Sequence, residues 1–265
     1  MRRAFPQDDR GLLLGDGLFE TILACGGRLM LLDAHLERLA RGCATLGLPA
    51  PDLARARRSC QAALRQAGDG RLAVRLTLTC GSGGRGLDRP GAPAMRLFTS
   101  VSAVSPVASP ARLATAMVRR NEGSVASRLK TLSYIDNVLA RREATLSGAD
   151  EAVMLNNRGE VAGAAAANLF WMADGRLLTP ALECGTLDGI MRRQVIDRSR
   201  RGGIEVREVR EGPKALASAD AVFLTNSLVG VRGVCALDGQ AIHGERIIAR
   251  AAGLVADVAG LAPGY

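Results

Sequence analysis

The sequence predicts an α+β protein of two lobes, with the division of the chain near residue 107. The first third of the chain alternates segments with strand-like and helix-like hydrophobic spacing. Residues 103–111, AVSPVASPA, combine two prolines with small side chains and show no periodicity, as is typical of a linker. Strand-like and helix-like segments alternate again beyond them. We therefore expect a small N-terminal α/β domain over residues 1–106 and a larger C-terminal domain over residues 107–265.

Hydrophobic spacing predicts the elements of the N-terminal lobe. A turn at Cys25–Gly27 joins two strands into a hairpin. Asp33 suits the N-cap of the helix that follows, because its carboxylate can accept hydrogen bonds from free N–H groups. The glycine- and proline-rich residues 81–93 are too long for a simple hairpin turn. The predicted strands cover 18–23, 28–32, 72–79 and 96–102, and the predicted helices run from 33 to 46 and from 51 to 66.

The C-terminal lobe shows the same two periodicities. Leu132, Ile135, Val138, Leu139 and Leu146 mark a helix that Gly148 can terminate. Turns are expected at 156–159 and 174–175. Further strands are predicted over 152–155, 170–172 and 221–225, and a further helix over 190–200.

Composition excludes several classes of protein. Hydrophobic residues make up 48% of the 265 residues and charged residues 23%, as in ordinary globular proteins. No apolar run approaches the roughly 18 residues of a membrane span, and the start MRRAFPQDDRG lacks a signal peptide's apolar run. The six cysteines form no CxxC pair, and there are only two histidines. We expect a cytoplasmic protein with reduced thiols, no metal site and no membrane partner.

The formal charge of +9 raises the question of nucleic-acid binding. Lys130 and Lys214 are the only lysines, so arginine supplies the other 33 of the 35 basic residues. These arginines are scattered along the chain, and one Trp, two Tyr and five Phe leave little material for base stacking. We therefore expect no nucleic-acid partner. An anionic small substrate accounts for the charge equally well.

Lys130 is a candidate for chemistry because lysine is so scarce. It precedes a well-patterned helix and follows the polar residues 121–128. A lysine amine can form a Schiff base with a carbonyl compound or an aldehyde cofactor. A solvated surface lysine is the alternative, so the hypothesis needs a second feature.

Groups suited to a phosphate supply that feature. Residues 185–191, GTLDGIM, run from a loop into a helix, so the backbone N–H groups of Ile190 and Met191 are expected at its positive end. Residues 225–227, Thr-Asn-Ser, end an apolar strand with hydroxyl and amide donors. Arg38, on the first long predicted helix, adds a charged donor. Each of these three features, taken alone, is also found as ordinary structure that binds no ligand.

Together these segments resemble the class IV aminotransferases, the fold-type IV enzymes that use pyridoxal phosphate. The resemblance runs in order and in register over residues 9–235. The loop GSGGRG and the run ANLFW are more similar to the aminodeoxychorismate lyases of this family than to its branched-chain or D-amino-acid aminotransferases. The segments are GDGLFET (15–21), LLDAHLERL (31–39), LKTLSYIDNVLARREA (129–144), GADEAVMLNNRGEV (148–161), ANLFW (167–171), LLTP (177–180) and DGIMR (188–192).

The resemblance implies a two-lobed architecture whose larger C-terminal lobe is β-barrel-like with helices. It implies pyridoxal 5′-phosphate as cofactor and a homodimer with the active site between the lobes. It also implies conversion of 4-amino-4-deoxychorismate to p-aminobenzoate and pyruvate for folate synthesis.

By position, the resemblance makes Lys130 the Schiff-base lysine, which would also remove the Cα proton. Thr21, in GDGLFET, is the candidate for a hydrogen bond to the leaving group. Arg85, in the glycine-rich loop, is our candidate for contact with a substrate carboxylate, with a solvent-exposed loop arginine as the alternative. The implied holders of the cofactor phosphate are Arg38, the backbone of Ile190 and Met191, and Asn226 and Ser227.

Two departures from the family pattern matter. The family places a glutamate, which faces the pyridine nitrogen, where this chain has Gly163. Glu160 is three residues earlier, and this odd spacing points it to the other face of a strand unless a bulge intervenes. The chain also starts close to GDGLFET, so the usual first strand is expected to be short or missing.

The missing glutamate favours elimination over transamination. An acid beside the pyridine nitrogen strengthens the ring as an electron sink, and transamination depends on that sink more than elimination does. The first alternative is nevertheless a branched-chain or D-amino-acid aminotransferase. The second is a catalytically degenerate member, against which the retained Lys130, Arg38 and DGIMR argue.

Overall fold

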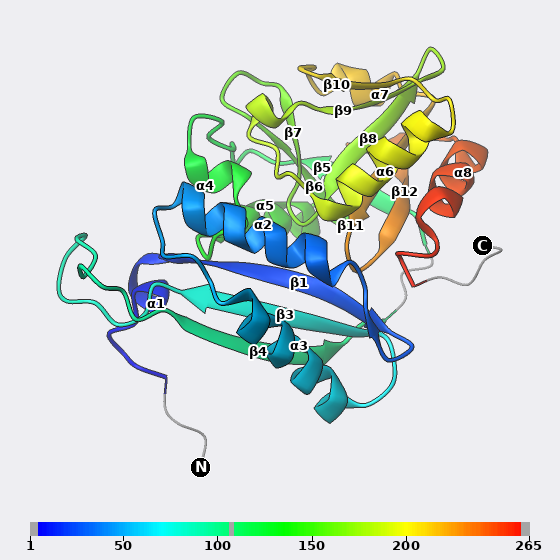
Figure 1. Cartoon of the computed structure of the whole chain (residues 1–265). Helices are drawn as coiled ribbons and strands as arrows, with labels where there is room; N and C mark the ends of the chain where they lie inside the picture. Colours follow the sequence, from blue (N-terminus) through cyan, green and yellow to red (C-terminus); the bar gives the residue numbers. More distant parts are fainter. Residues whose placement is uncertain (1–4, 106–108, 261–265) are drawn as a thin grey trace. The chain divides into compact units, whose positions relative to one another are not determined.

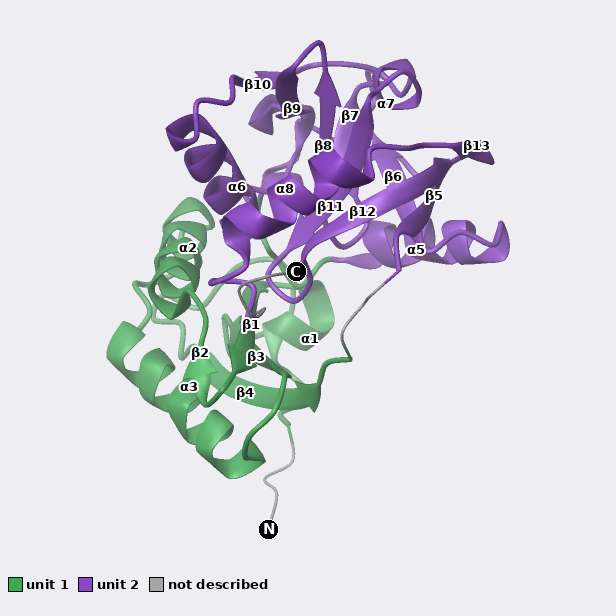
Figure 2. Cartoon of the chain, turned by 90° about the vertical axis from the view of Figure 1, so that its right-hand side faces the viewer, with its two compact units in different colours: residues 1–105, 129–133 green, residues 106–128, 134–265 purple. Residues whose placement is uncertain are grey.

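The computed structural model describes residues 5–105 and 109–260 (Figure 1). The predicted boundary between residues 106 and 107 falls outside the described residues and stays a prediction. The return of residues 129–133 to the N-terminal part of the chain was not predicted. By their internal contacts the residues form two units (Figure 2): unit 1 is Met1–Ser105 with Leu129–Ser133, and unit 2 is Pro106–Arg128 with Tyr134–Tyr265.

Unit 1 is built on a four-stranded antiparallel sheet with the order β2-β1-β3-β4. Leu18 and Ile22 lie on one face of β1, because alternate residues of a strand share a face. They pack in one apolar cluster with Leu36 and Leu39 of α2, which recur at helical spacing. The elements of unit 1 are α1 (Arg10–Leu14), β1 (Gly17–Cys25), β2 (Arg28–Leu29), α2 (Leu32–Thr45), α3 (Leu53–Ala67), β3 (Leu72–Thr79) and β4 (Arg96–Ala103).

The predicted cap of the first long helix is wrong. The N-cap of α2 is Leu31, in the left-handed conformation with φ 51°, and it makes no side-chain cap hydrogen bond. Asp33 lies inside the first turn, where it pairs with Arg57 and its charge faces the positive end of the helix dipole. Because α2 already begins at Leu32, the returning strand is shorter than the predicted 28–32.

In the described part of unit 2, nine strands form one mixed sheet with the order β10-β9-β8-β11-β12-β5-β6-β7, and β13 pairs with β12. The sheet curls into a half-barrel, which confirms the α+β class and the barrel-like second lobe. Leu169 and Trp171 of β8 pack into one buried cluster of the sheet. Phe170 between them lies on the other face, stacks on Phe223 at 5.2 Å between ring centroids and packs with α6 and α8.

The elements of unit 2 follow the predicted order, with additional short strands and helices. In chain order they are β5 (Ala111–Thr115), α4 (Val125–Arg128), α5 (Ile135–Leu146), β6 (Glu151–Leu155), β7 (Val161–Ala164), β8 (Asn168–Ala173), β9 (Arg176–Pro180), the 3-10 helix η1 (Leu182–Cys184), α6 (Ile190–Arg201), β10 (Val206–Val209), α7 (Lys214–Ala217), β11 (Ala221–Asn226), β12 (Gly230–Leu237), β13 (Gln240–Ala241) and α8 (Glu245–Val255).

The apolar face that predicts α5 is not its buried face within the chain. Ala140 and Ala144 are buried in a cluster with residues of β6. The four larger apolar residues of the helix point to solvent instead, and Leu132 lies outside the helix altogether. Their exposed fractions are 64% for Ile135, 58% for Val138, 40% for Leu139 and 75% for Leu146.

No helix among residues 5–105 and 109–260 has the length and apolar character needed to cross a membrane. In the same residues, no group of three or more His, Cys, Asp or Glu side chains gathers as a metal site would require. The six cysteines are free thiols. Burial raises the pKa of Cys43, Cys60 and Cys184 to about 11, so these three thiols stay protonated at neutral pH.

Leu36→Ala tests the packing of unit 1. Leu36 is 2% exposed, so its truncation leaves a cavity between α2 and β1 and is expected to lower the free energy of unfolding by about 2–5 kcal/mol. Urea denaturation measures the change. Leu87→Ala is the control, because Leu87 is 81% exposed and its loss should cost less than about 0.5 kcal/mol. Equal effects of the two substitutions would contradict the assignment of the core.

Candidate active site

Lys130 is held by backbone pairing with β1. The N–H of Phe19 donates to the Lys130 carbonyl at 2.9 Å, and the N–H of Leu132 donates to the Gly17 carbonyl at 3.0 Å. Thr131 forms an antiparallel bridge with Leu18 between these bonds. The segment takes up the edge of β1 that the two-residue strand β2 does not reach. Lys130 therefore starts from a turn whose backbone is fixed against β1.

The Lys130 side chain lies over an aromatic ring of the same strand. Its Nζ is 4.1 Å from the centroid of the Phe19 ring, and the Arg75 guanidinium carbon is 3.7 Å from that centroid. Both cations interact favourably with the ring's negative face. Thr21 is two residues beyond Phe19 and shares its face of β1. Thr21 and the ring under the Lys130 amine therefore lie on the same face of β1.

Arg38 lies in a buried cluster with Glu20 and His35. The Arg38 Nε donates to Glu20 Oε1 at 2.8 Å, and its Nη2 donates to Glu20 Oε2 at 2.5 Å. The Nδ1 of His35 lies 2.7 Å from the same Oε2. His35 and Arg38 are three residues apart on α2 and so share a helix face, while Glu20 lies on the face of β1 that packs against α2. The Glu20 and His35 side chains are each 1% exposed.

Electrostatics fixes the charges of this cluster. Burial would raise the pKa of Glu20, but the Arg38 charge and the hydrogen bonds from Arg38 and His35 outweigh it and lower that pKa to about 2. Burial lowers the pKa of His35 from its ordinary value and outweighs its hydrogen bond to Glu20. The neutral imidazole must therefore donate from Nδ1 to the ionised carboxylate. Its Nε2 has no hydrogen-bond partner in the described part of the chain.

Sequence reasoning missed Glu20 and His35, although a pattern pointed to both. Glu20 interrupts the apolar face that Leu18 and Ile22 define on one strand. A carboxylate at such a position needs a cation or donor from the element packed over it. The helix with His35 and Arg38 three residues apart supplies both.

Arg85 lies exposed in the loop after β3. The middle of this loop, directly after Arg85, is held by buried Arg10, which donates to the carbonyls of Gly86, Leu87 and Asp88 at 3.2, 2.7 and 3.0 Å. No hydrogen bond or ion pair joins Arg85 to any residue that the structure describes. Its substrate contact stays a prediction.

In unit 2, the first turn of α6 presents backbone donors. The N-cap Gly189 makes no side-chain cap bond to the first N–H groups of the helix, and Ile190 and Met191 are 3% and 1% exposed. Asn168 supports this turn, because its Nδ2 donates to the Leu187 carbonyl at 2.8 Å. A Cβ on Gly189 would overlap with the Asn168 Oδ1, which explains the glycine.

Asn226 and Ser227 form a turn at the end of β11. The Oδ1 of Asn226 accepts from the N–H groups of Leu228 and Val229 at 2.9 and 3.0 Å, and its Nδ2 donates to the Ala166 carbonyl at 3.1 Å. The Asn226 side chain therefore shapes the turn. The half-buried Ser227 hydroxyl has no partner within the described residues and is the better phosphate donor.

Asn168 links this turn to α6, and sequence reasoning missed it. It lies opposite Thr225 in the β8–β11 register while its amide contacts the start of α6. The two predicted groups of phosphate donors are thus at the same end of neighbouring elements. The Thr225 hydroxyl is fully buried and has no partner in the described part of the chain.

Arg120 is a further buried polar residue that sequence reasoning missed. Its Nη1 donates to the carbonyls of Ser127 at 3.1 Å and Gly185 at 3.4 Å, and its Nη2 lies 3.6 Å from the Met154 sulfur. Burial lowers the pKa of Arg120 below its usual value. The contacts tie α4, which leads to Lys130, to the loop before α6.

Gly163 lies on a β-bulge. Met154 pairs with Gly163 and Leu155 with Val161, so one extra residue stands on β7. Gly163 has φ +134°, a conformation that side-chain-bearing residues rarely adopt. A glutamate here would strain the backbone, although its Cβ would make only an ordinary contact with the Ala167 carbonyl oxygen at 3.4 Å.

A bulge does intervene between Glu160 and Gly163, but the Glu160 carboxylate is bonded elsewhere. Its Oε2 accepts from the Asn156 Nδ2 at 2.7 Å, and its Oε1 accepts from the Arg210 Nε and Nη2 at 3.0 and 2.9 Å. The Asn156 hydrogen bond and the Arg210 charge lower the pKa of Glu160. Its carboxylate is thus committed to holding the turn before β7 against Arg210.

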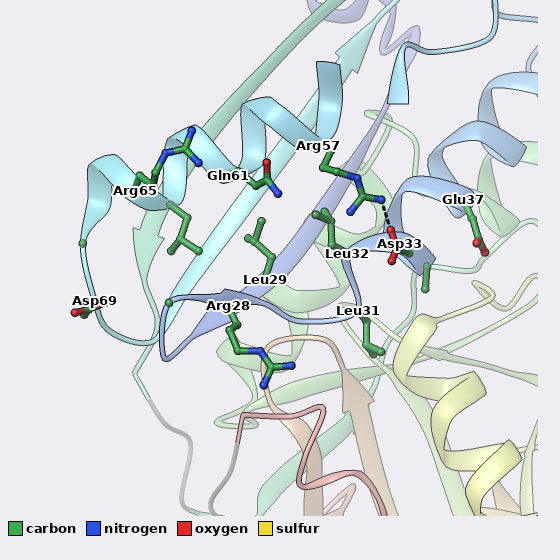
Figure 3. A pocket seen from close by; sticks show the side chains of 14 residues that line it. Arg28, Leu29, Leu31, Leu32, Asp33, Glu37, Arg57, Gln61, Arg65 and Asp69 are labelled. Carbon is green, nitrogen blue, oxygen red and sulfur yellow. Dashed lines mark hydrogen bonds and ion pairs between the residues drawn. The ribbon is translucent and has the colours of Figure 1, made fainter. Parts of the chain in front are cut away.

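A groove of about 920 Å³ in unit 1 is lined by none of the predicted site residues (Figure 3). Leu29, Leu32 and Leu64 supply its apolar lining, and the Arg57–Asp33 ion pair crosses one end. Lys130 does not line it. Three arginines and three acids contribute to its lining, so its charges balance: Arg28, Arg57 and Arg65 against Asp33, Glu37 and Asp69.

Comparisons of sequence and of structure with known proteins point to the same family. The family model for class IV amino-transferases matches residues 17–237. The chain is 30% identical over 228 residues to the aminodeoxychorismate lyase of Bacillus subtilis, covering 84% of this chain and 78% of that protein. It is similar to the structure of 4-amino-4-deoxychorismate lyase from Pseudomonas aeruginosa, with a TM-score of 0.87, 30% identity and coverage of 98% and 97%. A hypothetical aminotransferase from Mycobacterium tuberculosis in its PLP-bound form gives a TM-score of 0.85, 26% identity and coverage of 97% and 95%.

The free energy of unfolding is expected to fall on acidification in two windows. Below pH 6.5 the unfolded chain binds a proton at His35 that the folded protein excludes, because folding lowers the pKa of His35. From pH 4.5 down to about 2 the unfolded chain protonates Glu20 while the folded protein keeps it ionised. This second contribution is on the order of 3 kcal/mol.

Urea denaturation at a series of pH values measures both windows. Glu20→Gln should be less stable at neutral pH and should lack most of the lower window. An unchanged pH profile in this variant would contradict the buried ion pair.

Gly163→Ala tests the bulge. Because φ is +134°, the substitution is expected to cost on the order of 1–2 kcal/mol in thermal or urea denaturation. Gly253→Ala is the matched control, since Gly253 lies in α8 with no atom near a new Cβ and should be neutral or stabilising. A neutral Gly163→Ala would show that position 163 is not bound to this conformation.

Proposed function

Because the chain belongs to the class IV aminotransferase family, we propose that it cleaves 4-amino-4-deoxychorismate to p-aminobenzoate and pyruvate, a step of folate synthesis. Its cofactor is pyridoxal phosphate. The proposal of a lyase rests on the similarity to aminodeoxychorismate lyases at 30% identity and on the absence of a carboxylate at position 163.

The residues present fit the cofactor. Lys130 offers an amine on a turn whose backbone is hydrogen-bonded to β1. The uncapped N–H groups at the start of α6 and the Ser227 hydroxyl offer donors for the phosphate, with Arg38 as the charged donor. The buried Thr225 hydroxyl beside that turn, which has no partner among the described residues, is a further donor. A phosphate dianion is the kind of group that such donors bind.

When bound, the cofactor supplies an aldehyde that captures the substrate amine and a ring that withdraws electrons from the adjacent carbon. Lys130 Nζ would remove the proton from the carbon that carries the amino group, since the amine lies at that carbon when the substrate takes its place. The C–O bond to the enolpyruvyl group breaks as the ring becomes aromatic. Thr21 would donate a hydrogen bond to the leaving oxygen, and Arg85 would pair with a substrate carboxylate.

The bulge at Gly163 carries the choice of elimination over transamination. The position lacks a carboxylate to face the pyridine nitrogen, and its φ of +134° disfavours one. Glu160 is held by Arg210 and Asn156. A weaker electron sink impairs transamination, which needs a persistent carbanion, more than an elimination that expels its leaving group.

Pyruvate release tests the proposed function directly. Purified protein is incubated with 4-amino-4-deoxychorismate, with and without added pyridoxal phosphate, and pyruvate and p-aminobenzoate are measured. We expect equal amounts of both products in a cofactor-dependent reaction. Absence of product from protein that holds the cofactor, with amino transfer from D-alanine or a branched-chain amino acid to a keto acid, would assign an aminotransferase instead.

Lys130→Ala is expected to lower pyruvate release by at least about 10³-fold, because the variant loses both the covalent anchor and the base. Its thermal unfolding should be nearly unchanged. Lys214→Ala is the control, as Lys214 is the other lysine and lies exposed on α7. Retained activity in Lys130→Ala would refute the role of Lys130.

The exposed apolar face of α5 supports the proposal that the protein forms a homodimer. Val138 and Leu139 lie beside Ile135 on one exposed apolar face, which a second copy would cover. Val138→Asp is expected to raise the dimer dissociation constant at least about tenfold in analytical ultracentrifugation. A dimer of unchanged stability would place the interface elsewhere. Free thiols at all six cysteines support a cytoplasmic location.

A further inference from the structure

We propose that Glu20 and His35 are positioning residues that orient the Arg38 guanidinium for the cofactor phosphate. The inference rests on the role proposed above for Arg38, and it holds for a lyase and for an aminotransferase alike.

The geometry of the cluster sets the plane of the guanidinium. Glu20 engages the Nε and Nη2 of Arg38 through bonds of 2.8 and 2.5 Å, and this two-point contact removes rotation of the group. The directions of the other N–H donors follow from that plane, since the guanidinium is rigid. Arg38 lies on α2 and Glu20 on β1, two packed elements.

His35 fixes the carboxylate in turn. Its Nδ1 lies 2.7 Å from the Glu20 oxygen that also accepts from Arg38 Nη2. His35 is fully enclosed, so its ring cannot turn away without opening the interface of α2 and β1. Loss of the Nδ1–H donor would leave the carboxylate held by Arg38 alone, and both groups would gain freedom.

The charges of the cluster distinguish orientation of Arg38 from attraction of the phosphate by net positive charge. Ionised Glu20, cationic Arg38 and neutral His35 sum to zero, so the cluster offers the phosphate oriented donors rather than net positive charge. If Glu20 instead competed with the phosphate for Arg38, its neutralisation would strengthen phosphate binding. Positioning predicts that neutralisation weakens it. The two explanations therefore differ in sign.

The affinities of the apoprotein for pyridoxal phosphate and for pyridoxal test the inference. Both compounds carry the same aldehyde, so the dissociation constant of pyridoxal divided by that of pyridoxal phosphate cancels the contribution of Lys130 and isolates the phosphate. A smaller ratio means weaker binding of the phosphate. Absorbance titrations give both constants. Arg38→Met should reduce the ratio by about 10- to 100-fold. Glu20→Gln and His35→Leu should each reduce it by about three- to tenfold, with the pyridoxal constant nearly unchanged.

His35→Asn is the matched control, because an asparagine Nδ2 can replace the imidazole Nδ1 as the donor to Glu20. It should keep a ratio near that of the wild type while His35→Leu does not. An unchanged or increased ratio in Glu20→Gln, beside a reduced ratio in Arg38→Met, would overturn the positioning role. An unchanged ratio in Arg38→Met would remove its premise. Neither result depends on pyruvate release, which tests the proposed reaction separately.

Discussion

The pairing of residues 130–132 with the edge of β1 is the constraint on which the candidate site depends. It brings a lysine that is more than a hundred residues away in sequence onto the strand that carries Phe19 and Glu20. One face of that strand holds the aromatic ring under the lysine amine. The other face holds the carboxylate that anchors Arg38. A single strand thus relates the reactive amine to the charged donor proposed for the phosphate.

In unit 2, a single polar side chain likewise holds more than one segment of backbone. Asn168 stands opposite Thr225 and supports the first turn of α6, so a single side chain keeps two loops in register. Asn226 holds the turn that contains Ser227 through its Oδ1 and ties that turn to the Ala166 carbonyl through its Nδ2. Polar side chains here shape the backbone, and the donors that remain for a ligand are N–H groups and hydroxyls.

The helices and strands whose positions depend on local hydrophobic patterns could be predicted from the sequence. Strand 72–79 and the helix that begins at Ile190 follow directly from hydrophobic periodicity. Glu20 and His35 were missed because each is unremarkable alone, and only their contact across two elements shows the ion pair. The burial of α5 could not be judged either, since periodicity identifies an apolar face without saying what covers it. The bulge at Gly163 depends on the register of two strands, which a single strand's pattern does not reveal.

The bulge in β7 also limits which residues position 163 can carry. A bulge adds one residue to β7, so position 163 differs from a regular strand in backbone register as well as in side chain. A residue with a side chain would fit there without backbone strain only if the strand lost its extra residue and straightened. Neither change would help by itself, since the substitution strains the backbone and the deletion moves the neighbouring residues to opposite faces. The glycine at position 163 and the extra residue of β7 therefore depend on each other, and neither is readily changed alone.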